Sequence, residues 1–377
     1  MKTALVHDWL TGMRGGERAL EVFCRLFPDA PIYTLFHFRG RVSRTIESHP
    51  IHTSWMQSLP GIRTHYRKYL VFYPMAIESF DLSEYDLIIS TSHAVAKGAM
   101  AAPGAVSICY CHTPMRYIWD QFEVYFGPDQ CGLATRIAAH LVRDYLREWD
   151  RRTASRVHHF ISNSAFVARR IADVYNREAQ VIHPPVDTTF YTPSDEPPED
   201  YYLIVSALAP YKRLDLAIRA FSISGRHLVV IGFGPEQEKL FRGSAPNIDF
   251  RGSLSDSEVR DCYRRCKALI FPGIEDFGLT PIEVQACGRP VIAYAAGGVL
   301  ETVTEGVTGH FFDRQTPESL NRAVEEFESM QFDSNELRRR AMQFSTTTMT
   351  RRLIECLTGI IPAWSPPADD CPESPGC

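Results

Sequence analysis

The chain has 377 residues, a length that suits two domains of ordinary size. Its hydrophobic content of 45% and charged content of 23% are typical of a soluble globular protein. The formal net charge of −5 argues against general nucleic-acid binding, and no apolar run is long enough to predict a transmembrane helix.

The first ten residues, MKTALVHDWL, predict a β-strand and not a signal peptide, because His7 and Asp8 interrupt the short apolar run. We therefore expect a cytoplasmic protein whose ten cysteines are free thiols. The two close cysteine pairs do not have the spacing of a zinc site, so we expect buried core cysteines and no metal.

Short apolar runs alternate with helical patterns in the first half of the chain, which is typical of parallel α/β sheets. The predicted helices include Glu17–Leu26 and Leu133–Arg152. The predicted strands are Thr3–Val6, Leu87–Ser90, Val106–Tyr110, Phe160–Asn163 and Gln180–His183.

The second half repeats this alternation, so the sequence predicts two doubly wound, Rossmann-like domains that face each other across a cleft. Its predicted strands are Tyr202–Ser206, Leu228–Gly232, Ile248–Arg251, Ala268–Pro272 and Val291–Tyr294. Its predicted helices are Arg213–Ser222, Pro235–Phe241, Asp256–Cys266, Pro281–Ala286 and Pro317–Ser329.

A stretch rich in proline and acidic residues, HPPVDTTFYTPSDEPPED at 183–200, cannot continue a helix or a central strand. The predicted organisation is therefore an N-terminal domain at 1–185, a linker at 186–200 and a C-terminal domain at 201–345. A last helix within 346–362 has an apolar stripe and is expected to return to the N-terminal domain. The tail at 363–377 has little to bury and is expected to be disordered.

Ligands of doubly wound sheets bind outside the carboxyl ends of the strands, so the loops there are the candidate site. In MRGGER, residues 13–18, Gly15 and Gly16 either bring the backbone close to an anion or form an ordinary turn. In CHTPMRYIWD, residues 111–120, His112 could donate to a phosphate or a sugar hydroxyl, or could be a structural histidine.

Two loops of the second half have similar features. In APYKRLD, residues 209–215, Lys212 and Arg213 oppose the dipole of the helix that follows, which suggests a bound anion, although a solvated basic pair is the alternative. In IGFGPE, residues 231–236, Gly232 and Gly234 match only part of a dinucleotide fingerprint and predict a tight turn close to a ligand.

The stretch EDFGLTPIE, residues 275–283, has two interpretations. One is a capping box, with Thr280 as N-cap, Pro281 at the first helical position and Glu283 bonding back. The other is a ligand site, in which a helix N-terminus binds a phosphate while Glu275 and Glu283 accept hydrogen bonds from sugar hydroxyls.

The segment FPGIEDFGLTPIEVQACGRPVIAYAAGGVLETV, residues 271–303, resembles the donor site of the family-4 retaining glycosyltransferases, which have the GT-B fold. Glu275 and Glu283 match the E-x7-E motif of that family. The opening MKTALVHDWLTGMRGGER and the segment VSALAPYKRLDLAI resemble the bacterial mannosyltransferases that build O-antigen and exopolysaccharide. The resemblance runs through most of residues 1–345 and implies a nucleotide-sugar donor, with GDP-mannose expected.

The resemblance also implies roles for particular residues. Glu275 would contact the donor sugar, Glu283 the ribose and Lys212 the diphosphate. The family has an arginine where this chain has Ala207, and Arg213 is a candidate substitute. The remaining implied residues are the catalytic His112, the donor contacts Gly15, Gly16, Gly232, Gly234, Phe277, Gly278, Leu279 and Thr280, and the acceptor contacts Asp8 and Arg116.

The resemblance implies retention of the anomeric configuration, by front-face attack. Lys212, the helix N-terminus and the glycine amides would stabilise the leaving diphosphate without a metal ion or cofactor. The chain contains no Asp-x-Asp motif, which fits that expectation.

Basic and aromatic residues mix in LPGIRTHYRKYLVFYP, residues 59–74, and arginines follow one another along a predicted helix at 136–156. Such surfaces suit an anionic membrane, so we expect peripheral contact with the inner leaflet and a polyprenyl-diphosphate-linked saccharide as acceptor. The alternative for the helix is a solvated face on which Asp144, Glu148 and Asp150 pair with Arg136, Arg143, Arg147, Arg151, Arg152 and Arg156.

Two other classes of protein stay open. A nucleotide-sugar epimerase of similar architecture would turn over its sugar nucleotide without an acceptor. A non-catalytic sugar-nucleotide binding protein would bind the donor and stay inactive with every acceptor, but the presence of Glu275, Lys212 and His112 together argues against it.

Overall fold

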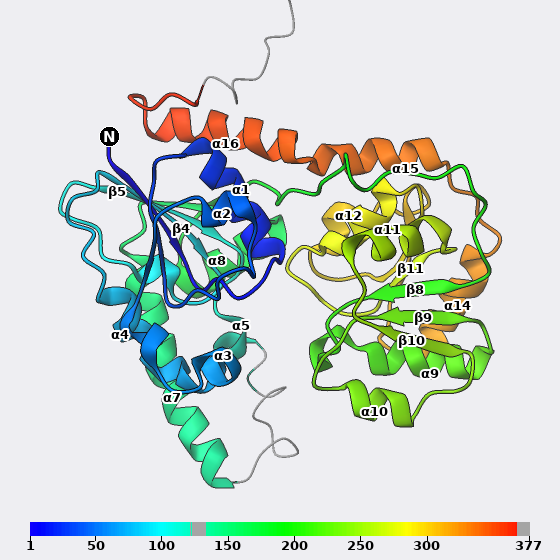
Figure 1. Cartoon of the computed structure of the whole chain (residues 1–377). Coiled ribbons are helices and arrows are strands. Elements are labelled where there is room, and N and C mark those ends of the chain that lie inside the picture. The colour runs from blue at the N-terminus through cyan, green and yellow to red at the C-terminus, as the bar shows by residue number, and fades with distance from the viewer. Residues whose placement is uncertain (121, 123–132, 368–377) are drawn as a thin grey trace, which may run out of the picture. The chain divides into compact units, whose positions relative to one another are not determined.

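The computed structural model describes residues 1–120, 122 and 133–367 (Figure 1). The chain divides into two compact units, Met1–Pro185 with Met349–Cys377 and Val186–Thr348. We call these unit 1 and unit 2. Each is built around a parallel β-sheet with helices on both faces, so the predicted fold class of two Rossmann-like domains is confirmed.

In its described part, unit 1 has a seven-stranded sheet with the order β3-β2-β1-β4-β5-β6-β7. The strands are β1 (Thr3–His7), β2 (Ile32–Thr34), β3 (Ile51–Thr53), β4 (Leu87–Ser92), β5 (Val106–Cys111), β6 (His159–Ser162) and β7 (Ala179–Val181). The helices are α1 (Gly15–Leu26), α2 (Arg44–Glu47), α3 (Ile62–His65), α4 (Tyr73–Glu78), α5 (Arg116–Trp119), α7 (Leu133–Ala154) and α8 (Ala165–Tyr175). Short 3-10 turns are η1 (Trp55–Ser58), η2 (Tyr66–Phe72) and η3 (Ala96–Gly98).

Unit 2 has a six-stranded sheet with the order β10-β9-β8-β11-β12-β13. The strands are β8 (Tyr202–Val205), β9 (Leu228–Ile231), β10 (Ile248–Gly252), β11 (Leu269–Phe271), β12 (Val291–Tyr294) and β13 (Gly309–Phe312). Its helices and turns are η4 (Pro210–Lys212), α9 (Leu214–Ser224), α10 (Gln237–Arg242), α11 (Asp256–Arg265), α12 (Leu279–Ala286), α13 (Val299–Thr302), α14 (Pro317–Phe327), α15 (Ser334–Ala341) and η5 (Met342–Phe344).

Both faces of the central strands of unit 2 are buried, which explains why β8, β9, β11 and β12 are continuous apolar runs. Ile204 and Val230 pack on one face, in the same cluster as residues of α9 and α14. Leu203 and Val229 point to the other face, in a cluster with residues of α11 and α12. Figure 1 shows α9 and α12 on opposite sides of strands β8 and β9.

The last helix, α16 (Thr346–Ile360), packs on unit 1 as predicted. Leu353 and Leu357 are fully buried in the same cluster as Leu20 and Phe23 of α1. The chain beyond the helix adds Trp364, which stacks on Phe27 with ring centroids 5.2 Å apart. The predicted disordered tail therefore does not begin at residue 363, and residues 368–377 lie outside the described part.

Three short strands were missed by the sequence analysis, namely β2, β3 and β13. The predicted linker at 186–200 also differs from the structure, which includes these residues in unit 2. Val186 and Tyr191 are only 1% and 2% exposed, and both belong to a core cluster of that unit. Proline stops regular structure in this stretch, but its apolar side chains still pack.

Candidate functional site

Two loops of unit 2 bring Lys212 and Glu275 together. Lys212 ends η4, which follows β8, and Glu275 lies in the loop after β11. These strands are parallel neighbours, so both loops leave the carboxyl edge of the sheet. The Lys212 ammonium forms an ion pair with the Glu275 carboxylate, and the two side chains remain 14% and 19% exposed.

Glycines permit this close approach of the two loops. A β-carbon on Gly273 would lie 2.9 Å from both the Cα and the carbonyl oxygen of Lys212, closer than β-carbons come to other atoms. On the other side of the loop, Gly297 adopts a φ of +85°, and the N–H of Gly298 donates to the carbonyl oxygen of Glu275 at 2.9 Å. The position of Glu275 is therefore fixed through its backbone.

Helix α12 begins at Leu279, with Gly278 as its N-cap at a φ of +87°. The predicted capping box is therefore wrong, because Thr280 lies inside the first turn and is not the N-cap. Glu283 is 8% exposed and accepts a hydrogen bond from the Tyr263 hydroxyl at 2.9 Å. Its contact with a donor ribose stays a prediction.

Residues 277–280 form the turn into α12. Phe277 is 3% exposed and its ring lies 5.7 Å from that of Phe344 in the core, so any contact with a donor would come from its backbone. Gly278, Leu279 and Thr280 stand at the helix N-terminus, where N–H groups lack partners within the helix and the dipole favours an anion. Their contact with a diphosphate stays a prediction.

Gly232 and Gly234 are required by the fold of unit 2 itself. A β-carbon on Gly232 would overlap the carbonyl oxygen of Ser206, and one on Gly234 would overlap that of Leu208. The loops after β8 and β9 also share backbone hydrogen bonds, including one from the Leu208 N–H to the Phe233 carbonyl at 3.0 Å. These glycines let two strand-end loops pack together, and their contact with a donor stays a prediction.

Arg213 is paired with residues of its own unit, and its role as a substitute for the arginine missing at position 207 stays a prediction. It is the N-cap of α9 in a left-handed conformation, with a φ of +54°. Its guanidinium pairs with Asp215 at 3.2 Å and donates to the Gln315 side chain at 3.3 Å. Asp215 balances the cation at this helix start, so the basic pair does not by itself require a bound anion.

In unit 1, Asp8 follows β1 and is fully buried. Its Oδ1 accepts hydrogen bonds from the N–H groups of Val95 and Ala96, both at 2.7 Å, and its Oδ2 from those of His93 and Ala94, at 2.6 and 3.0 Å. Burial opposes ionisation, but the His93 side chain and N–H hold the pKa of Asp8 well below its ordinary value of 3.8. Asp8 thus fixes the segment after β4, and its contact with an acceptor stays a prediction.

His112 follows β5 and lies against the glycine loop. A β-carbon on Gly16 would be 3.5 Å from its Nε2, and that nitrogen is buried without a hydrogen-bond partner among the described residues. Burial, together with the neighbouring His93 and His7, lowers the pKa of His112 to about 3. The imidazole is therefore neutral near pH 7.

Gly15 and Arg116 occupy the first positions of α1 and α5. The α1 N-terminus is held by Glu17, whose carboxylate accepts from the Arg14 N–H at 3.0 Å. The contacts predicted for Gly15 with a donor and for Arg116 with an acceptor stay predictions.

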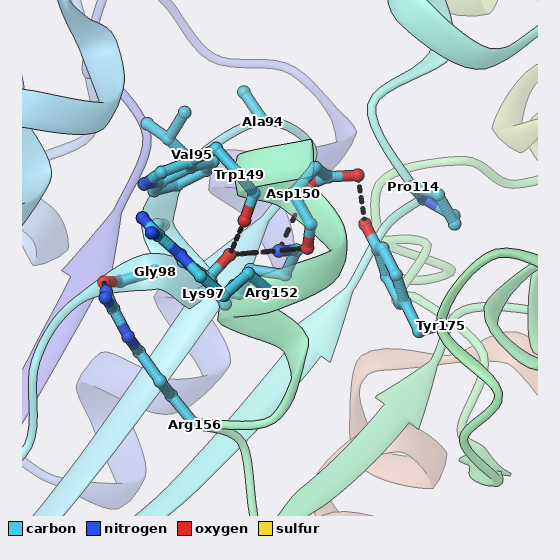
Figure 2. A network of polar contacts seen from close by, with 12 residues as sticks. Ala94, Val95, Lys97, Gly98, Pro114, Trp149, Asp150, Arg152, Arg156 and Tyr175 are labelled. Carbon is cyan, nitrogen blue, oxygen red and sulfur yellow. Dashed lines mark hydrogen bonds and ion pairs between the residues drawn. The ribbon is translucent and has the colours of Figure 1, made fainter. Parts of the chain in front are cut away.

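The segment HAVAKG, residues 93–98, was missed by the sequence analysis. Lys97 is 2% exposed and its ammonium lies 3.1 Å from the Asp150 carboxylate, and it donates to Thr153 Oγ1 at 2.8 Å. Figure 2 shows Lys97 reaching Asp150 while Tyr175, whose hydroxyl donates at 2.9 Å, meets the same carboxylate from the other side. The sequence signal that could have identified this segment is a histidine and a lysine that follow a buried strand.

Two arginines of α7 are engaged within unit 1. Arg147 donates to the Ile118 carbonyl at 2.6 Å, and its guanidinium lies 4.9 Å from the centre of the Trp119 ring. Arg151 lies 4.7 Å from the same ring. These two arginines hold contacts inside unit 1, and the contact of this helix with an anionic membrane stays a prediction.

In the described part of the chain, no group of three or more His, Cys, Asp or Glu side chains could hold a metal ion. The described helices include none that is both long and apolar enough to cross a membrane. The cysteines in this part are free and buried, as predicted, whereas Cys131, Cys371 and Cys377 lie outside it.

Two family models match this chain. The model described as Glycosyltransferase Family 4 matches residues 10–190, and the model described as Glycosyl transferases group 1 matches residues 192–345. A D-inositol 3-phosphate glycosyltransferase from Mycobacterium sp. (strain KMS) is 29% identical over 178 residues. That match covers 41% of this chain and 40% of the relative, so the chain spans about two fifths of the length of such relatives.

Solved structures support the fold. HepE from Anabaena in complex with UDP has a TM-score of 0.69 at 17% identity, over 95% of this chain and 100% of that one. Sucrose-phosphate synthase from Thermosynechococcus elongatus has a TM-score of 0.71 at 15% identity, over 97% of this chain and 100% of that one. At these identities the likeness establishes the two-domain architecture alone.

Proposed function

We infer that this chain, which belongs to the glycosyltransferases, moves a hexose from a nucleotide sugar bound by unit 2 to an acceptor hydroxyl. The observation that carries the proposal is the partly exposed Lys212–Glu275 pair at the carboxyl edge of the sheet, where the loop of Lys212 leads into α9 and that of Glu275 into α12. A nucleotide sugar presents a diphosphate and sugar hydroxyls, which require a cation, N–H donors and a carboxylate. This edge supplies all three.

In the proposed reaction the bond between the anomeric carbon and the diphosphate breaks and the acceptor oxygen bonds to that carbon. The proton of the acceptor hydroxyl passes to the departing diphosphate, which leaves from the same face of the sugar. Lys212 leaves Glu275 to stabilise the charge on the departing diphosphate, a contact worth about 1.5–3 kcal/mol. The freed Glu275 carboxylate accepts hydrogen bonds from the sugar hydroxyls. The N–H groups at the start of α12 complete the diphosphate site.

We propose GDP-mannose as the donor, retention of configuration, and activity without a metal ion or cofactor. The support for the donor is the resemblance of residues 1–18 and 205–218 to bacterial mannosyltransferases, and the support for retention is the resemblance of residues 271–303 to the family-4 retaining glycosyltransferases. The support for metal independence is that Lys212 and the helix N-terminus provide the positive charge that a divalent ion would otherwise provide.

We further propose that the acceptor is a polyprenyl-diphosphate-linked saccharide and that unit 1 rests on the inner leaflet. Trp55, Phe72 and Met75 are 41%, 42% and 54% exposed, and the two rings lie 6.3 Å apart. The chain between them carries the exposed cations Arg63, Arg67 and Lys68. Apolar side chains beside cations suit an anionic membrane surface.

Flotation with anionic vesicles at low salt tests the membrane contact. The double variant Phe72→Ser/Met75→Ser should lose binding, whereas Phe233→Ser in unit 2, which removes a ring that is 65% exposed, should keep it. Equal flotation of both variants, or no flotation of the parent protein, would contradict this part of the proposal.

A thermal-shift panel of nucleotide sugars tests the main proposal. A donor at 100 times its dissociation constant stabilises the folded state by about 2.7 kcal/mol. The ligand that stabilises the protein is then assayed with EDTA, with and without acceptor, and the anomeric configuration of the product is read by NMR. Turnover without acceptor would indicate an epimerase, and binding without turnover a non-catalytic protein.

A further inference from the structure

Three neighbouring strands of unit 1 end at the same edge of the sheet. Ser92 of β4 pairs with Cys111 of β5, so the residues that follow, His93 and His112, leave the sheet side by side. Their ring centroids lie 6.3 Å apart. Asp8 follows β1, the neighbour of β4 on the other side, so this edge gathers a carboxylate and two imidazoles.

The backbone anion site at this edge is already filled. Four consecutive N–H groups, from His93 to Ala96, point at one place, an arrangement that binds anions. The carboxylate of Asp8 occupies it and also lies 3.0 Å from Nδ1 of His93. With Nδ1 committed to Asp8, the opposite nitrogen, Nε2, is the one that His93 can offer to a ligand.

The His93 side chain is 30% exposed, whereas Asp8 beneath it has no exposed surface. Burial works against a charge on His93, but the adjacent Asp8 carboxylate, with Glu17 beyond it, raises the pKa of His93 above its ordinary value of 6.5. The pKa of the neighbouring His112 is shifted in the opposite direction, so of the two rings His93 binds a second proton more readily. Neighbouring groups whose pKa values are pushed apart are typical of functional sites.

The position of His93 is fixed from several sides. The edge of Trp9 meets its ring with centroids 4.5 Å apart, and Asp8 holds its backbone. Lys97, four residues on, is anchored to Asp150 in the interior. Gly98 lies so close to Trp149 that a β-carbon there would overlap the ring, as the crowding in Figure 2 illustrates. A ligand therefore meets an imidazole that is already oriented.

We propose that His93, oriented by Asp8, binds a phosphate or diphosphate group of a substrate through its Nε2–H, with His112 and Gly16 lining the same edge. This inference rests on the proposed transferase function, in which both substrates carry phosphate. The group comes either from the lipid-linked acceptor or from the nucleotide sugar, and the two sources are separated by kinetics.

The experiment compares two substitutions of His93. In His93→Asn the side-chain amide takes the place of Nδ1, so the bond to Asp8 is kept and the outward donor is lost. In His93→Gln the amide takes the place of Nε2, so the outward donor is kept without its charge. His159→Gln is the matched control, because His159 is exposed at the opposite edge of the same sheet, at the start of β6.

The full chain is titrated with inorganic pyrophosphate, and its imidazole signals are followed by NMR. The His93 signal is identified as the one that is missing from His93→Asn. Pyrophosphate should shift this signal and leave the His159 signal in place. His93→Asn should melt close to the parent temperature and raise the KM of one substrate about tenfold, the effect of losing one charge-assisted hydrogen bond. His93→Gln should raise that KM less. An increase confined to the acceptor assigns the group to the acceptor, and one confined to the nucleotide sugar assigns it to the donor.

The proposal is overturned if pyrophosphate leaves the His93 signal unmoved, or if His93→Asn has the KM values of the parent protein. A purely structural His93 would give that second result, because the bond to Asp8 persists. If the parent protein shows no transfer with any donor, the proposed function fails, and the pyrophosphate titration then decides the His93 site by itself.

Discussion

The carboxyl edges of the two sheets use charge in different ways. In unit 2 the Lys212–Glu275 pair stays partly exposed, so a ligand can replace either partner at modest cost. In unit 1 Asp8 and Lys97 are 0% and 2% exposed; Asp8 is held by four backbone N–H groups and His93, and Lys97 pairs with the buried Asp150. Charges buried in this way cannot be separated cheaply. The comparison indicates that the charged pair of unit 2 is available to bind a ligand, whereas most of these charges in unit 1 stabilise the fold.

The largest effect is expected from breaking the buried pair of unit 1. Lys97→Met leaves Asp150 without its cation in the interior, and losses of this kind cost about 3–5 kcal/mol. Urea unfolding should therefore show a much lower midpoint. Lys68→Met, at an exposed position of the same unit, should change the free energy of unfolding by about 0.5 kcal/mol or less. Equal stabilities of the two variants would remove the contrast between the two edges.

The second effect separates activity from stability in unit 2. Lys212→Ala should lower kcat/KM by about 10²–10³, the usual result of removing one group that stabilises transition-state charge. The free energy of unfolding should change by about 1 kcal/mol or less, because the pair is partly exposed. Lys239→Ala, which removes a lysine that is 74% exposed, is the control and should be fully active. A large loss of stability with intact kcat/KM would place Lys212 with the structural charges of unit 1.

A smaller effect is expected when the loops of unit 2 are pushed apart without removing a charge. In Gly273→Ala the new methyl group would meet the backbone of Lys212 at 2.9 Å, and overpacking of this kind costs about 1–3 kcal/mol. The shift should also lower kcat/KM, although less than Lys212→Ala does. Gly243→Ala is the matched control, since its β-carbon would be 3.8 Å from the nearest atom, the carbonyl oxygen of Lys239. Unchanged kcat/KM in Gly273→Ala would show that the spacing of the loops is not critical.

The central strands were predictable because parallel strands buried on both faces are continuous apolar runs, as β4 and β12 show. Strands β2 and β3 have only three residues each, too few for a periodic signal. In α16, the apolar stripe was long enough to predict both the helix and a packed face. Thus long or doubly buried elements could be predicted, whereas the short strands β2 and β3 could not, although β7, a three-residue strand at the sheet edge, was predicted.

The candidate site could be predicted where a local motif identifies the residues, and not where contacts with residues far along the chain determine their positions. Lys212 and Glu275 were identified by motif and lie together. The capping box failed because the N-cap is Gly278, where a β-carbon would clash with Phe271 of β11, a contact between elements. Arg213 pairs with Asp215 nearby in the sequence, but it also donates to Gln315, far along the chain, a contact that the local sequence does not predict. Contacts between residues far apart in the sequence depend on the tertiary fold, so the local sequence does not reveal them.

The smallest effect is expected at His310, which is far from Lys212 along the chain of unit 2. It tests whether the contacts of His310 with two carboxylates stabilise the fold. Both nitrogens of His310 on β13 face carboxylates, Nδ1 at 2.5 Å from Glu305 and Nε2 at 2.9 Å from Glu326, so both donate only when the ring is protonated. Burial opposes the charge, but these hydrogen bonds raise the pKa of His310 above its ordinary value of 6.5.

Because the pKa of His310 is higher in the folded state, its stabilisation is complete below the unfolded value of 6.5 and is lost as the pH rises through the folded value. The melting temperature of His310→Gln should therefore fall below that of the parent protein at about pH 5.5 and approach it at about pH 8.5. In a Glu326→Gln background, one carboxylate fewer faces the ring, so the dependence on pH should be weaker. If the melting temperature of His310→Gln stayed below that of the parent protein by the same amount across this pH range, His310 would act through packing. Unit 2 would then resemble unit 1, whose paired side chains stabilise the fold.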